Sequence, residues 1–389
     1  MRHVADHGPR SRATIAIETG FNKTTVSSLV AELIDKGLLR ETGEEENPGA
    51  IGRPGQIVEV DGDVVAGIGV EINVDFLAAC ATDLKGRIRY AEQVSADNRH
   101  ARPEVVCARL AELTARVVKS VLSQGLLPVG VAVAVPGLVD VDHGVMVFAP
   151  NLGWKTTPVA DLLRQSLGAT SLPIRVDNGP NLGAASELWE GAARGLEDFV
   201  YISGEIGVGG GMVVGGEVFR GASGFGGEFG HVTMDPNGRP CGCGSRGCLE
   251  TVAGQEALLR LAGIEDPPGT PTKDLTETIV EHARRGDART TEALEAVGRS
   301  LGIAAASLVN LFDPQAIVLG GYFAPLVEWL VDPMRDELQA RSMAARYSHV
   351  QVLRSELGWD AALRGGALLS LRELIADPSA IDALRRAAR

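Results

Sequence analysis

One short segment, HVTMDPNGRPCGCGSRGC, holds the residues of this sequence whose types and spacing are most specific for a chemistry. It contains one histidine and three cysteines in a His-x9-Cys-x-Cys-x4-Cys spacing: His231, Cys241, Cys243 and Cys248. One imidazole and three thiolates form a complete tetrahedral shell for Zn2+, and the glycines beside the cysteines let the sulfurs converge. Because four protein ligands leave no position for water, the spacing predicts a structural zinc site. Three free thiols on a loop are the alternative.

The same segment lies within GGEFGHVTMDPNGRPCGCGSRGCLE, which resembles the signature of the ROK family, a group of sugar-responsive repressors and sugar kinases. The resemblance extends over the whole chain from about residue 64. It implies an α/β fold with an actin-like (ribonuclease H-like, ASKHA) body of two lobes. In kinase members, the cleft between the lobes holds a sugar and ATP.

The resemblance also implies a set of sugar-binding residues. In PNLGW, Asn151 matches an asparagine that contacts a sugar hydroxyl, and Asn178 matches the next such residue. Glu228 and His231 in GEFGH match a pair that grips the far side of the ring, and Glu250 in GCLE matches the last. Carboxylates accept hydroxyl protons, and amides both donate and accept. With zinc on one ring nitrogen, the other becomes a fixed N–H donor aimed at the sugar. The alternative is a scatter of surface polar residues.

The chemistry of the kinase members does not carry over to this sequence. Those members have an aspartate that takes a proton from the sugar where this chain has Gly179, which cannot act as a base. Asp177, two residues earlier, is a poor substitute. The two phosphate loops have become Glu71–Asp75 and Glu205-Ile206, and carboxylates facing a polyphosphate repel it. We therefore predict no catalytic residue and no enzyme activity.

Two short helices are predicted near the N-terminus. Ser11 caps the first, which runs to about Thr19, and Gly20 breaks it. Asn22 caps the second helix, which ends at Gly37. Two helices joined by a glycine-containing turn form a helix-turn-helix pattern.

The second of these helices is amphipathic. Its apolar stripe follows the spacing i, i+3, i+4, i+7, i+8: Val26, Leu29, Val30, Leu33 and Ile34. Its opposite face begins with short hydrogen-bonding side chains and one lysine, which suit base edges and phosphates: Lys23, Thr24, Thr25, Ser27 and Ser28. We expect these five residues to contact DNA.

A wing is predicted after the helices. Leu38–Glu41 and Gln56–Val60 alternate like strands around the loop GEEENPGAIGRPG, where Arg53 can enter a minor groove. These features predict a winged helix-turn-helix DNA-binding domain over residues 1–60. Seven Lys/Arg against nine Asp/Glu in that range count against DNA binding, and a small helical cap on an enzyme is the alternative.

The rest of the chain alternates predicted strands and helices, as α/β proteins do. A hairpin is predicted over Val64–Val94, with its turn at Asp83–Gly86. Further strands are predicted over 129–135, 174–176, 199–203 and 316–319, and helices over 103–122, 179–188, 254–263, 273–286 and 288–311. We expect one actin-like lobe over 64–185 and a second, with the zinc motif, over 186–389. A C-terminal helix can return to the first lobe.

Charge and composition exclude several classes. A net charge of −13 and a pI near 5.1 argue against a chain that coats nucleic acid along its length, but not against one small DNA-reading domain. The longest apolar run, Val129–Val139, is too short to span a membrane, and MRHVADHGPR is no signal peptide. Five cysteines cannot form a disulfide framework. We therefore expect a cytoplasmic protein.

Three functions fit these observations. The favoured one is a kinase-inactive, sugar-responsive repressor of carbohydrate metabolism genes. As a homodimer or homotetramer, it would present its winged helices to a palindromic double-stranded DNA operator. The second is an ATP-dependent sugar kinase with an N-terminal regulatory domain. The third is a repressor that has lost ligand control and is governed by a protein partner.

Overall fold

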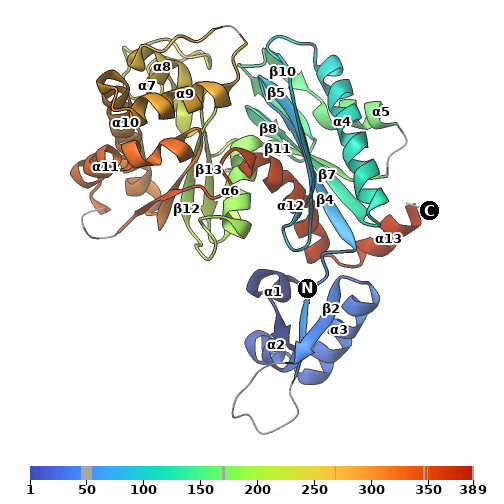
Figure 1. The fold of residues 1–389 in the computed structure, drawn as a ribbon. Coiled ribbons are helices and arrows are strands. Elements are labelled where there is room, and N and C mark those ends of the chain that lie inside the picture. The colour runs from blue at the N-terminus through green and yellow to red at the C-terminus, as the bar shows by residue number, and fades with distance from the viewer. Residues whose placement is uncertain (45–54, 169–170, 268, 345–346, 348, 388–389) are drawn as a thin grey trace.

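The computed structural model describes the chain except for residues 45–54, 169–170, 268, 345–346, 348 and 388–389. Two five-stranded sheets with their helices lie side by side, and a small unit of helices and three short strands lies at one end (Figure 1). The expected α/β architecture is confirmed. Arg53 lies outside the described residues, so its predicted DNA contact stays a prediction.

The small unit is formed by the N-terminal residues and is called the N-terminal unit below. The two predicted helices are confirmed: Ser11 accepts a hydrogen bond from the Thr14 amide, and Asn22 accepts one from the Thr25 amide at 2.8 Å. An additional first helix, α1, was not predicted. The elements are α1 (Arg2–His7), β1 (Arg10–Ser11), α2 (Arg12–Thr19), α3 (Lys23–Asp35), β2 (Leu39–Glu44) and β3 (Gln56–Val60), with sheet order β1-β3-β2.

The apolar stripe predicted for α3 is wrong at one position. Val26, Val30 and Leu33 are buried, but Leu29 is 48% exposed. The reason is geometric, because a helix that covers so small a sheet buries only a narrow stripe, and Leu29 lies beyond its edge.

The first large sheet has the order β11-β7-β4-β5-β6, with β4, β7 and β11 parallel and β5 and β6 antiparallel. The single hairpin predicted over 64–94 is wrong, because the chain also turns after Ile72 and makes three strands. A small sheet, β10-β9-β8, follows β7. The elements are β4 (Val65–Ile72), β5 (Phe76–Asp83), β6 (Ile88–Ser95), α4 (Pro103–Ser123), β7 (Leu127–Val135), β8 (Leu138–Asp140), β9 (Val145–Ala149), β10 (Trp154–Thr157), α5 (Val159–Leu167) and β11 (Ile174–Asn178).

The second large sheet has the order β14-β13-β12-β15-β16, and most of the remaining helices pack on it (Figure 1). The predicted helices at 254–263, 273–286 and 288–311 are confirmed to within a few residues. The elements are α6 (Gly179–Glu190), β12 (Phe199–Gly204), β13 (Val208–Val214), β14 (Glu217–Val218), η1 (Phe229–His231), α7 (Glu250–Ala253), α8 (Gln255–Ala262), α9 (Thr272–Arg284), α10 (Ala288–Phe312), β15 (Ala316–Gly321), α11 (Phe323–Arg341), β16 (Gln351–Arg354), η3 (Gly358–Asp360), α12 (Ala361–Ala376) and α13 (Ala380–Ala387).

Helices α6 and α12 lie between the two large sheets (Figure 1). Helix α12 packs on the face of the first sheet opposite α4, where Ala78 and Cys80 contact Leu363. It comes so close that a Cβ on Gly69 would lie 2.0 Å from the Leu363 carbonyl oxygen, which only glycine allows at this position. The Ser186 hydroxyl of α6 donates to the Ala361 carbonyl at 2.8 Å and joins the two helices.

The N-terminal unit rests on the ends of α12 and α13. Its apolar core is continuous with Leu371, Leu374 and Ile381 of those helices. Ion pairs surround this contact, with Lys36 Nζ at 2.6 Å from Asp382 Oδ2 and Arg372 paired to Asp6. The two C-terminal helices therefore fix the position of the N-terminal unit. No helix in the described parts of the chain has the length and apolar character to cross a bilayer.

Candidate functional site

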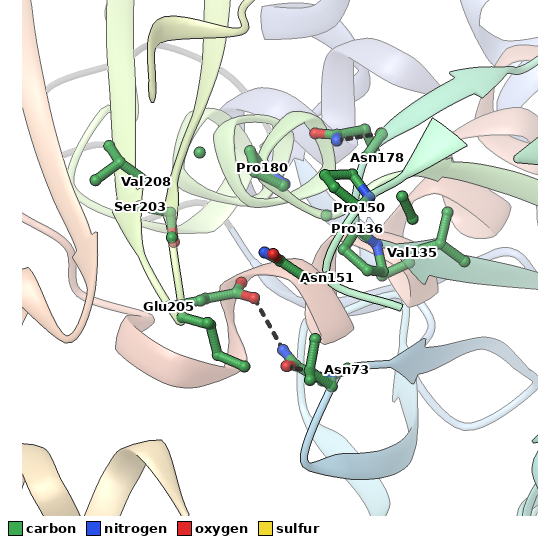
Figure 2. Close-up of a pocket in the computed structure, with 18 of the residues that line it drawn as sticks. Asn73, Val135, Pro136, Pro150, Asn151, Asn178, Pro180, Ser203, Glu205 and Val208 are labelled. Carbon is green, nitrogen blue, oxygen red and sulfur yellow. Dashed lines mark hydrogen bonds between the residues drawn. The ribbon is translucent and has the colours of Figure 1, made fainter. Parts of the chain in front are cut away.

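A pocket lies between the two large sheets and is lined by elements of both (Figure 2). The structure brings all five residues predicted to bind a sugar to its wall: Asn151, Asn178, Glu228, His231 and Glu250. The pocket is therefore the candidate ligand site.

Asn178 has a structural task as well. It caps α6, its Oδ1 accepting from the Asn181 amide at 3.3 Å, while its Nδ2 donates to the Gly137 carbonyl at 2.7 Å. An Asn cap followed by Pro180 in the first turn explains why the helix begins here. One N–H of this amide remains for a ligand. Asn151 is exposed, and Figure 2 shows its side chain extending from the loop after β9 into the pocket.

The far wall comes from η1 and the start of α7. The Glu228 Oε2 atom lies 3.9 Å from His231 Nε2, and the Val208 amide donates to Glu250 Oε2 at 3.4 Å. Burial raises the pKa of the Glu228 carboxyl, with His231 opposing the rise and Glu250 adding to it. The wall thus presents two carboxyl groups and one imidazole to the pocket.

The predicted metal-binding residues converge beside this wall. The donor atoms of His231, Cys241, Cys243 and Cys248 all lie within 4.8 Å of one another. The His231 Nδ1 to Cys241 Sγ distance and the Cys243 to Cys248 Sγ distance are both 3.7 Å. Ligands at tetrahedral corners around Zn2+, with bonds of ~2.3 Å to sulfur, are separated by about this distance. The donor set therefore fits a closed tetrahedral metal site.

His231 belongs to both the metal cluster and the pocket. Its Nδ1 faces Cys241, and its Nε2 faces Glu228. The backbone around the cysteines is tightly folded, since Gly247 has a φ of +63° and a Cβ there would lie 1.6 Å from the Asp235 carbonyl oxygen. Cys241 Sγ lies 3.5 Å from Glu250 Oε1, a second link between the cluster and the pocket. A change in the metal cluster would therefore alter the positions of His231 and Glu250 in the pocket wall.

The segments that replace the two phosphate loops meet at the pocket. Asn73 Nδ2 donates to Glu205 Oε2 at 2.8 Å (Figure 2). The same nitrogen donates to Glu71 Oε1 at 3.2 Å. Burial and the neighbouring Glu205 raise the pKa of Glu71, and burial raises the pKa of Glu205. Sequence reasoning identified both acids but missed Asn73, which joins the first sheet to the second at this place.

The two residues considered for the catalytic base also differ in their surroundings. Gly179 lines the pocket. Asp177 is 1% exposed, and Arg220 Nη2 donates to its Oδ2 at 2.5 Å. Asp177 is not among the described residues that line the pocket. Its carboxylate is committed to an ion pair that joins β11 to the segment after β14.

A second candidate surface lies on the N-terminal unit. Lys23, Thr24, Ser27 and Ser28 are exposed on α3, whereas Thr25 is half-buried. A groove between α2, α3 and β3 is lined by Arg12, Ala13, Lys23, Ser27, Gly55 and Gln56. Sequence reasoning did not single out Arg12, which begins α2, lines this groove and pairs with Glu41.

Some of the known proteins that resemble this chain match nearly its whole length. The model of the ROK family matches residues 67–373. The xylose repressor of Bacillus subtilis (strain 168) is 30% identical, over 94% of this chain and 92% of its own length. A solved ROK family transcriptional regulator, a homolog of the Escherichia coli MLC protein, has a TM-score of 0.77 and 25% identity, over 98% of this chain and 95% of that chain.

A solved kinase resembles only part of the chain. A ROK family glucokinase from Streptomyces griseus, in complex with glucose and AMPPNP, has a TM-score of 0.68 and 31% identity. It covers 79% of this chain and 99% of its own. The two regulators therefore also match the N-terminal unit, whereas the kinase matches the body.

Proposed function

This chain belongs to the ROK family, and from that premise we propose that it is a sugar-responsive, DNA-binding transcriptional repressor. The observation that carries the proposal is the match of the regulators over nearly the whole chain, the N-terminal unit included. The ligand is a sugar bound between the two sheets by Asn151, Asn178, Glu228, His231 and Glu250. The DNA target is a double-stranded operator of genes for carbohydrate metabolism, read by two or more copies of the chain.

The metal cluster supports the ligand site in this proposal. His231, Cys241, Cys243 and Cys248 hold a Zn2+ ion, which supplies a fixed cross-link and no open coordination position. With Nδ1 committed to the cluster, the Nε2 of His231 carries the proton and donates a hydrogen bond to a sugar hydroxyl. The geometry that favours this arrangement is the 3.9 Å separation of Nε2 from Glu228, a second group for the same ligand.

A continuous series of contacts connects the pocket with the N-terminal unit. Helix α6 begins at the pocket with Asn178 and ends near Trp189. The Arg372 guanidinium lies 5.2 Å from the centre of the Trp189 ring and pairs with Asp6 of α1. A sugar that shifts α6 against α12 therefore changes the contacts that hold the N-terminal unit. This route gives the ligand a physical means to alter how two winged helices face an operator.

We expect a sugar to change the affinity of the protein for DNA. The measurement is fluorescence anisotropy with a duplex selected from a random library, titrated in the presence of D-xylose, D-glucose or N-acetyl-D-glucosamine. Coupling of this kind changes affinity by about 5- to 150-fold. A chain that selects no duplex would contradict the DNA-binding part of the proposal. A chain that binds one duplex with the same affinity in every sugar would contradict the sugar response and favour control by a protein partner.

We expect the outward face of α3 to read base sequence. Ser27→Ala is predicted to weaken binding to the selected duplex by about 5- to 10-fold and to leave binding to unrelated duplexes unchanged, because a lost base contact affects only the matching sequence. Thr25→Ala, at a half-buried position, is predicted to have a smaller effect. Ser123→Ala, on the exposed end of α4, is the matched control. An equal loss on all duplexes for the Ser27 variant would identify a phosphate contact and contradict the prediction.

A second candidate function is an ATP-dependent sugar kinase. The observation that favours it is the match of the Streptomyces griseus glucokinase over nearly its full length. The acids at positions 71 and 205 and the glycine at 179 oppose it.

A further inference from the structure

We infer that the pocket accepts sugars that carry no anionic group and rejects sugars with a phosphate or carboxylate, with Glu205 as the main determinant of this limit. The inference rests on the proposed sugar response and names the ligand class of the same pocket. It distinguishes a repressor that senses the free sugar from one that senses its phosphorylated product.

The charges of the pocket wall carry the argument. The described lining residues include four with a carboxyl group, one with an imidazole and none with an ammonium or guanidinium group: Glu71, Glu205, Glu228, Glu250 and His231. A phosphate dianion that leaves water for this wall finds no counter-charge, and an unpaired buried charge is strongly disfavoured. Sugar hydroxyls, in contrast, donate hydrogen bonds to the same carboxyl oxygens.

Nearby positive groups are already committed elsewhere. Arg220, on the segment after β14, is held by Asp177, which is 1% exposed. The N-terminus of α6 faces the pocket, but Asn178 caps the Asn181 amide, and Pro180 has no N–H to offer. At the metal cluster, three thiolates more than neutralise a bound Zn2+ ion. The start of α6 therefore offers a ligand phosphate the partial positive charge of the helix dipole, and neither Arg220 nor the metal cluster supplies a full positive charge.

Glu205 is held in place at the wall. Its Oε2 accepts a hydrogen bond of 2.8 Å from Asn73 (Figure 2). The same Asn73 amide also donates to Glu71. Burial raises the pKa values of both acids, so the pair retains a proton more readily than ordinary carboxyl groups do. A protonated carboxyl is a hydrogen-bond donor to a sugar, but it supplies no positive charge to a dianion. The preference for neutral sugars over sugar phosphates therefore does not require both acids to be ionised.

The test is isothermal titration of the full chain at constant ionic strength. The probes are D-xylose, D-glucose and N-acetyl-D-glucosamine, the 6-phosphates of the last two, and D-glucuronate. We expect D-glucose or N-acetyl-D-glucosamine to bind. The 6-phosphate of the sugar that binds is expected to bind at least about 100-fold more weakly than the free sugar. If D-xylose alone binds, the comparison is made with D-xylose 5-phosphate, which should bind at least about 100-fold more weakly than D-xylose.

Glu205→Gln provides the residue-level test. Glutamine keeps the oxygen that accepts from Asn73 and replaces the acid with a neutral amide that can donate to a phosphate, so the ratio of free-sugar to phosphate affinity is expected to fall by about tenfold. Glu217→Gln, on the exposed strand β14, makes the same replacement outside the pocket and should leave the ratio unchanged.

The outcomes separate the two levels of inference. A 6-phosphate or D-glucuronate that binds as tightly as the free sugars would overturn the inference, while the proposed sugar response would stand. An unchanged ratio in the Glu205 variant would remove that residue as the determinant. If no probe binds, the proposed sugar response is contradicted, and the inference falls with it.

Discussion

Replacing Cys243 with serine is expected to remove the bound metal and, with it, measurable sugar binding. Cys243 Sγ lies 3.7 Å from Cys248 Sγ in the metal cluster, and a serine hydroxyl is a poor ligand for Zn2+ in a thiolate-rich site. Without the ion, His231 loses the contact that fixes its ring and the proton on its Nε2. Because Cys243 is only half-buried, the lost packing is small, and the effect comes mainly from the metal.

Three measurements check this prediction. Metal content by elemental analysis should fall from about one ion per chain to none. The melting temperature should fall by at least about 5 °C, because loss of a structural metal costs several kcal/mol of folding free energy and ~1 kcal/mol corresponds to roughly 2–4 °C in domains of 150–250 residues. The sugar affinity should fall by more than about 100-fold, because His231 and the neighbouring Glu250 both contact the cluster.

Cys107→Ser is the matched control. Cys107 is fully buried in α4, within the core of the first sheet and away from the metal cluster. Its replacement is expected to lower stability through a buried hydroxyl while retaining metal and sugar binding. A metal-free Cys243 variant that binds sugar with the affinity of the unsubstituted protein would show that the cluster and the pocket are independent.

The metal cluster could be predicted from the sequence because all its donors lie within residues 231–248, and glycines lie between and beside the cysteines. The arrangement around Asn73 could not. Asn73 and Glu205 are 132 positions apart, and the fold alone brings the end of β4 to the end of β12. The pairing of Asp177 with Arg220 has the same origin. Side-chain identity indicated which acids replace the phosphate loops, but not which groups hold them.

The helices show the same limit of prediction from local sequence. The caps at Ser11 and Asn22 are local signals, and the helices that they begin were predicted correctly. A C-terminal helix was expected, but the bounds of α12 were not predicted, because the helix is largely apolar and has no clear periodic stripe. It lies between α6 and the first sheet, and that position buries most of its residues. The platform for the N-terminal unit is therefore a property of the tertiary fold.

We expect the unsubstituted protein to phosphorylate every tested sugar at least about 10⁴-fold more slowly than a ROK glucokinase does. A missing general base costs about 10²–10⁴-fold by itself. The acids at 71 and 205, bridged by Asn73, then act before chemistry, because they place carboxyl groups where a polyphosphate would bind. The measurement is ADP release with ATP, Mg2+ and the same panel of free sugars, with a ROK glucokinase as the positive control.

The Gly179→Asp variant separates the effect of the missing general base from that of the altered phosphate loops. A Cβ at position 179 would lie 3.8 Å from the Ala362 Cβ and 3.9 Å from the Val135 carbonyl oxygen, which are ordinary contacts. An aspartate in the first turn of α6 also suits the positive end of the helix dipole, so the variant should fold. We expect it to bind sugar measurably and still to release no ADP, because the nucleotide loops remain altered. Phosphorylation by the unsubstituted protein, or strong rescue by Gly179→Asp alone, would show that ATP binds productively and would make the kinase the better assignment.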